Sequence, residues 1–155
     1  MLKKVQCERM NPMNEDTICL LKECNAGCKM ATNSMEQVME YVKNDELRKL
    51  IDQYNEPHIA LGEECNQLLK EDNKEEKDPP PMAKTFSWLT TEVKLMMNDD
   101  SNKIAKIMIN GCNMGIQSLS EYVNKYVNAS KEVVDLANRL IQIEQDFMND
   151  LRVFL

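Results

Sequence analysis

The feature that most constrains the fold of this 155-residue chain is a heptad-like spacing of apolar residues that recurs in four long segments. Steps that alternate between three and four residues place these side chains on one stripe of a helix, which bundle helices bury against each other. Polar residues interrupt the stripe at the centre of two segments, His58 in the second and Glu144 in the fourth. The sequence therefore predicts a helical bundle with polar residues in its middle.

Capping residues and short connections set the expected order of the helices. Asn14 and Asn44 are suitable N-caps, and each is followed by two acidic residues that favour a helix N-terminus. Only a residue or two separates the first helix from the second, and the third helix is joined to the fourth as tightly, so each pair should form an antiparallel hairpin. The expected helices span residues 17–43, 45–70, 101–127 and 130–155.

The two hairpins are joined by a longer connection. Residues 71–81 are highly charged and end in three prolines, so we expect a solvated linker there. Residues 82–97 repeat apolar residues at helical spacing and predict a short crossover helix, which contains Trp88. Together they can carry the chain from one end of the bundle to the other, so that the third helix runs parallel to the second. We expect one domain over residues 1–155, with residues 1–15 as an N-terminal arm.

The charge of the chain argues against several partners. Its formal net charge is −7 and its pI is near 4.8, whereas nucleic acids and anionic membrane surfaces bind basic faces. The longest stretch without a charge, Ile107 to Ser120, is too short to cross a bilayer. Met1 to Pro12 contains no apolar run of the kind found in secretory signals, so we expect a cytoplasmic protein.

The six cysteines do not resemble a disulfide framework. Most lie at helical spacing within the apolar stripes, and a chain of this length needs no bridges, so reduced and buried thiols are expected. Cys24 and Cys65 fall at matching heights on neighbouring helices, which leaves a disulfide or redox pair between them as an alternative. Cys7 precedes the bundle and should be exposed.

Pro57 lies inside the second predicted helix, next to His58. It lacks the amide that would bond to the carbonyl of Gln53, so we expect the helix to bend there. Irregularities of this kind often accompany functional sites, although a tolerated bend explains the residue as well.

Two long hairpins joined by a crossover resemble the ferritin-like superfamily over nearly the whole chain. The chain looks closest to a family of uncharacterised bacterial ferritin-like bundles. The resemblance rests on the first hairpin, on Trp88 in the predicted helix 82–97, on the stretch from Gly111 to Gly115, and on the final helix ending in Gln-Asp-Phe-Met-Asn-Asp-Leu-Arg. It implies an all-α, ferritin-like up-down four-helix bundle, and it implies no settled activity.

The usual di-iron centre of that superfamily needs two Glu-x-x-His motifs and two further glutamates. This chain has a single histidine, His58, and Asn55 stands three residues before it in place of glutamate. Phe147 stands three residues after Glu144, where the motif needs histidine. Ala31 and Gly115 fall at the corresponding level of the other two helices. We therefore expect no di-iron centre of the usual form and no oxygen chemistry based on it.

A different metal site remains open. If the hairpins pair as their short turns require, His58, Glu144, Cys112 and Cys28 lie at similar heights, and their donor atoms suit Zn or ferrous Fe. The alternative is a neutral core histidine bonded to Glu144 or to a backbone carbonyl, with the thiols as small apolar fillers.

Two functions follow as hypotheses. The first is a non-enzymatic structural or interaction protein that self-associates, most simply as a dimer, through an apolar outer stripe of the first helix or through the helix with Trp88. Surplus apolar residues off the stripes motivate it: Ile18, Leu20, Met30 and Ile109. The second is a metal-binding protein for storage, sensing or redox work that uses His58 and Glu144 with a core cysteine.

Overall fold

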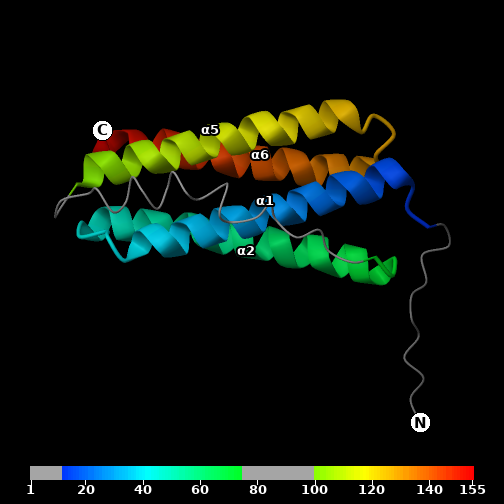
Figure 1. Cartoon of the computed structure of the whole chain (residues 1–155), viewed down its shortest axis with the longest axis horizontal. Coiled ribbons are helices and arrows are strands. Elements are labelled where there is room, and N and C mark those ends of the chain that lie inside the picture. Colours follow the sequence, from blue (N-terminus) through cyan, green and yellow to red (C-terminus); the bar gives the residue numbers. More distant parts are fainter. Residues whose placement is uncertain (1–11, 75–99) are drawn as a thin grey trace, which may run out of the picture.

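The computed structural model describes residues 12–74 and 100–155, and in these residues every regular element is helical (Figure 1). The expected crossover helix, most of the linker and most of the N-terminal arm lie outside the described residues. The prediction of an all-α four-helix bundle is confirmed. The elements are α1 Glu15–Met39, α2 Asp45–Glu71, α5 Ser101–Lys125 and α6 Lys131–Leu151, followed by the short 3₁₀ helix η1 Arg152–Phe154.

Side-chain caps begin all four long helices. The Asn14 side chain accepts a hydrogen bond from the Thr17 amide at 2.8 Å, and Asn44 accepts one from the Leu47 amide at 3.0 Å. Asp100 and Ser130 cap α5 and α6 in the same way. Each cap satisfies one of the amides that a helix start leaves without a partner, so the residues identified in the sequence do determine where α1 and α2 begin.

Two helix ends differ from the prediction by four residues: α1 stops at Met39 rather than at residue 43, and α6 stops at Leu151 rather than at residue 155. The Arg48 guanidinium, from the start of α2, donates hydrogen bonds to the carbonyl oxygens of Met39 and Val42, at 3.3 and 2.8 Å. These bonds satisfy carbonyls that a further helical turn would otherwise occupy, so the chain leaves the helix early. The other ends agree within two residues, and α2 is continuous through Pro57.

The helices form two antiparallel hairpins, α1 with α2 and α5 with α6 (Figure 1). Helices α2 and α5 run parallel, and the end of α2 lies at the opposite end of the bundle from the start of α5. The hairpins meet where α2 packs on α6 and α1 packs on α5 and α6. This is the hairpin, crossover, hairpin order that the connection lengths predict.

Hydrogen bonds tie the two hairpins together at one end of the bundle. The Ser130 amide donates to Thr17 Oγ1 at 2.8 Å, and the Asn128 amide donates to an Asp16 carboxylate oxygen at 2.9 Å. The Asn14 side chain returns a bond to the Asn128 carbonyl at 2.8 Å. These contacts fix the start of α1 against the loop before α6, and with it the register of one hairpin on the other.

The apolar core is divided into two clusters along the bundle. One is built around Ile51 and Phe147, and the other around Leu61 and Leu140. His58 lies between Ile51 and Leu61 on α2, and Glu144 lies between Leu140 and Phe147 on α6. The polar interruptions of the sequence stripes therefore meet at the boundary between two apolar halves.

In the described part of the chain, no helix combines the length and the apolar character that a membrane span requires.

Candidate functional site

The centre of the bundle holds a buried pair, His58 of α2 and Glu144 of α6. The Nε2 atom of His58 is in hydrogen-bonding contact with Oε1 of Glu144, and the side chains are 0% and 9% exposed. A carboxylate this far from water needs a hydrogen-bonded or charged partner, and His58 provides it. The heptad stripes and the connection lengths placed the two residues at similar heights and left a bond between them as one alternative.

The backbone of α2 sets the orientation of the imidazole ring. His58 Nδ1 lies 2.6 Å from the carbonyl oxygen of Tyr54, one turn earlier in the helix. A carbonyl only accepts hydrogen bonds, so Nδ1 carries the proton and donates it. The other nitrogen, Nε2, is therefore the one presented to Glu144.

The pKa of His58 is raised above its ordinary value of 6.5. Burial is the largest influence and lowers the pKa, because it disfavours the charged imidazolium. The hydrogen bond to Glu144, the charge of Glu144 and the bond to the Tyr54 carbonyl act in the opposite direction and together outweigh burial. The pair therefore favours a protonated, positively charged His58 against Glu144.

Cys112 of α5 is the third member of the cluster. Burial, the negative charge of Glu144 and a hydrogen bond to Glu144 all raise the pKa of the Cys112 thiol. The thiol therefore stays protonated and can donate to the carboxylate. A continuous hydrogen-bonded path results, from the Tyr54 carbonyl through His58 and Glu144 to Cys112.

Cys28, the fourth residue of the predicted metal site, is not part of this path. It packs with Cys24, Cys65 and Leu61 in the neighbouring apolar cluster, and its Cβ lies 3.3 Å from the position that a Cβ on Gly62 would take. Burial, then the neighbouring thiols of Cys65 and Cys24, and last the charge of Glu144 raise the pKa of Cys28. Among the described residues, no three His, Cys, Asp or Glu side chains are placed to hold one metal ion.

The described part of the chain contains five cysteines, all of them free and four of them buried, as the sequence predicts. Cys24 and Cys65 share an apolar cluster and are not bridged. Burial raises the pKa of Cys65 to about 12 and also raises that of Cys24. Such thiols are mostly protonated and poor nucleophiles. Cys7 lies outside the described residues.

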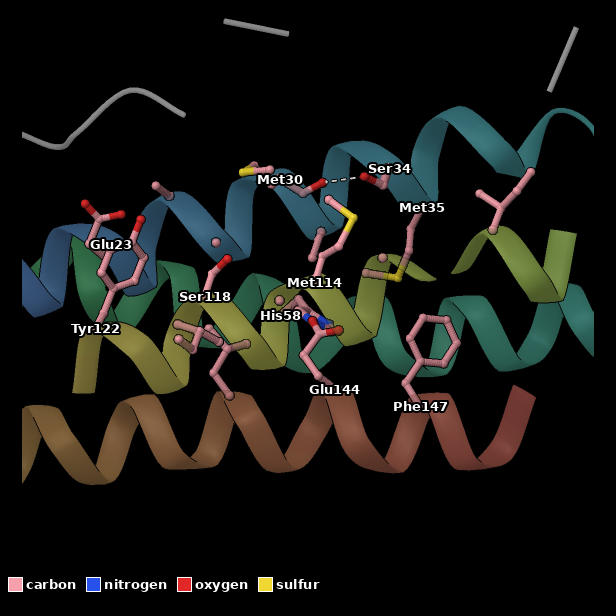
Figure 2. Close-up of a pocket in the computed structure, with 18 residues that line it drawn as sticks. Glu23, Met30, Ser34, Met35, His58, Met114, Ser118, Tyr122, Glu144 and Phe147 are labelled. Atoms are coloured by element: carbon pink, nitrogen blue, oxygen red, sulfur yellow. Dashed lines mark hydrogen bonds and ion pairs between the residues drawn. The ribbon is translucent and has the colours of Figure 1, made fainter. Parts of the chain in front are cut away.

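A groove between α1 and α5 opens above the pair, and the sequence analysis did not predict it (Figure 2). Its volume is about 240 Å³, its lining is mostly apolar, and His58 and Glu144 form part of it. Glu23 and Tyr122 lie together at one end in Figure 2, and Phe147 lies at the other. The remaining lining residues are Ala26, Gly27, Met30, Ala31, Ser34, Met35, Ile107, Gly111, Met114, Gly115, Ser118, Leu119 and Leu140.

Small residues make this groove. A Cβ added at Gly111 would meet nothing within 4 Å, and one at Gly115 would lie 3.7 Å from Glu144 Cδ, an ordinary contact. Close helix packing therefore does not require glycine at either position, although each glycine costs about 1 kcal/mol of helix stability relative to alanine. Together with Ala31 on the facing helix, the two glycines leave this volume open.

No protein-family model matches the chain, and no curated protein matches it. The fold does match a solved structure, the crystal structure of a DUF305 fragment from Deinococcus radiodurans, with a TM-score of 0.74 and 11% sequence identity. The match covers 93% of this chain and 98% of that chain. At this identity the likeness shows the fold alone, which in the described residues of this chain is an all-helical four-helix bundle.

The raised pKa of His58 predicts how stability depends on pH. His58 has a pKa of about 6.5 in the unfolded chain and a higher pKa in the folded chain. At pH values between these two, the folded state binds more protons than the unfolded state. The stabilisation is therefore complete below pH 6.5 and is lost as the pH rises through the folded pKa. We expect the free energy of unfolding, measured by urea denaturation from about pH 5.5 to about pH 8, where cysteine thiols of the unfolded chain are still mostly protonated, to fall across this window.

Two variants provide the controls. In His58→Gln no imidazole titrates, so the fall should disappear. In Glu144→Gln the burial that lowers the pKa of His58 remains while the charge that raises it is gone, so the slope should reverse. An identical slope in the wild type and His58→Gln would show that the pair does not produce it.

Proposed function

We propose that this chain is a non-catalytic, cytoplasmic ferritin-like bundle that acts by binding, with the groove between α1 and α5 as its recognition surface. We also propose that it belongs with the uncharacterised bacterial ferritin-like bundles that its sequence resembles. The observation that carries the binding function is the open apolar groove of about 240 Å³ above a buried ionisable pair. Ligand sites are typically concave and mostly apolar, with a few placed polar groups.

The chemistry of the pair favours binding over catalysis. Both ring nitrogens of His58 are hydrogen-bonded, one to the Tyr54 carbonyl and one to Glu144. A general base needs a nitrogen free to take a proton from a substrate, and a nucleophilic cysteine needs a lowered pKa. The pKa of the Cys112 thiol is raised instead. The side chains of His58, Glu144 and Cys112 therefore satisfy each other's hydrogen bonds.

The binding function predicts that a compact apolar molecule enters the groove. We expect 2-phenylethanol to shift the methionine methyl NMR signals of Met30, Met35 and Met114, which line the groove. Gly115→Leu should abolish these shifts, because its side chain would occupy the space beside Glu144.

The matched control is Asn113→Leu, which adds the same side chain at an exposed position of α5 outside the groove. It should leave binding unchanged. Equal binding by the wild type and Gly115→Leu would contradict the proposal that the groove is the recognition surface.

We further propose that the chain forms a homodimer. Of the surplus apolar residues expected to point outward, Leu20 is instead fully buried in the core, while Ile18, Met30 and Ile109 are half-buried. Two further apolar side chains are exposed, Ile59 on α2 by 44% and Met114 on α5 by 46%. Because exposed apolar side chains favour association, the α2 and α5 faces could also take part in the dimer. Light scattering should give about twice the 18.0 kDa mass of one chain. A monomer at high concentration would count against the dimer.

Metal binding is the second candidate function. One observation favours it: the Nδ1–H of His58 bonds to a backbone carbonyl, as in most metal-ligating histidines, so Nε2, which faces Glu144, would be the ligand atom once its own proton is released. Zn or ferrous Fe would suit these donors. Cys28, from the neighbouring cluster, would have to move to join them.

Mass spectrometric metal analysis of anaerobically purified, untagged protein tests this candidate. It predicts about one Zn or Fe per chain, lost in His58→Ala, with Cys65→Ala as a control that removes a thiol of the other cluster. Wild-type protein without metal would leave the apolar binding function as the better account.

A further inference from the structure

We propose that the groove between α1 and α5 binds a small hydrophobic cation, a molecule with one aromatic ring and a protonated amine. The amine bonds to Glu144, and the ring lies among the methionines and Phe147. This inference rests on the binding function proposed above and adds the chemical class of the ligand.

The size of the groove limits the ligand to a single ring. A cavity of about 150 Å³ accommodates benzene, whereas drug-sized ligands occupy pockets of about 300 Å³ or more. The groove, at about 240 Å³, lies between these values. It therefore has room for one ring with a short substituent.

The apolar part of the lining suits an aromatic ring. Met30, Met35 and Met114 place flexible, polarisable thioethers around the groove, and Phe147 adds an aromatic surface at one end (Figure 2). Sulfur–aromatic contacts and offset ring stacking are both favourable. Methionine side chains also adapt to ligands of different outline.

The charges around the groove favour a cation. Glu144 uses Oε1 to bind His58, while its Oε2 lies 3.8 Å from the Cβ position of Gly115, on the groove side. Glu23 lines one end of the groove. The described lining residues include two carboxylates, the imidazole of His58 and no Lys or Arg.

An ammonium group at Oε2 would extend the hydrogen-bonded path of the pair. His58 and Cys112 already donate to Glu144, and a carboxylate can accept about four hydrogen bonds. A charged donor makes a stronger bond to a carboxylate than a neutral one does. Glu144 therefore distinguishes an amine from an alcohol of the same shape.

Three probes of similar shape and different charge test the proposal on the full chain: 2-phenylethylamine, 2-phenylethanol and 3-phenylpropanoate. Each is titrated near neutral pH into methionine-methyl-labelled protein. We expect the amine to bind about tenfold more tightly than the alcohol, because its bond to the carboxylate is charge-assisted. The carboxylate probe should bind most weakly, because it meets a surface of its own sign.

Two variants locate the preference. Glu144→Gln should bring the affinity for the amine down to that for the alcohol, while Glu56→Gln, an exposed position of α2 outside the groove, should keep the tenfold difference. The order of affinities in the wild type tests the proposal independently, even if Glu144→Gln fails to fold.

The outcomes separate this inference from the binding function. Equal affinities for amine and alcohol, both lost in Gly115→Leu, would overturn the cation preference and leave the binding function intact. Binding of none of the three probes would overturn both, and would be the result if another part of the chain or a second copy filled the groove.

Discussion

The rest of the structure depends on the buried pair of His58 and Glu144. Removing two charged groups from water costs several kcal/mol each, and their attraction compensates only when the geometry is close. Here the partners come from different hairpins and meet at the boundary between two apolar clusters. The Tyr54 carbonyl and the Cys112 thiol complete their hydrogen bonding. The pair therefore fixes how the hairpins face each other, and it forms the polar floor of the groove.

The architecture could be predicted because it depends on interactions between residues that are close together in the sequence. The apolar stripes define which face of each helix is buried, the asparagine caps define where α1 and α2 begin, and the short turns require antiparallel hairpins. Matching heights along the hairpins then brought His58 opposite Glu144. The end of α1 was wrong because it depends on Arg48, a residue of the next helix whose reach across the turn leaves no periodic signal.

The groove and the exact membership of the cluster could not be predicted in the same way. Height along the bundle placed Cys28 and Cys112 together with the pair, but rotation about the helix axis decides which thiol faces Glu144, and only the packed structure fixes it. The small residues Ala31, Gly111 and Gly115 are visible in the sequence. Whether neighbours fill the space that they leave depends on the separation of α1 and α5, which no single helix encodes.

The long sequence separation within the pair has a consequence for how the molecule assembles. The contact joins residues 86 positions apart, whereas each hairpin closes through a turn of a few residues. Local contacts form faster than distant ones, since less chain entropy is lost in closing them. Each half can therefore become helical before the two dock. The contact between His58 and Glu144 forms only when the hairpins dock, because each hairpin supplies one of the two side chains.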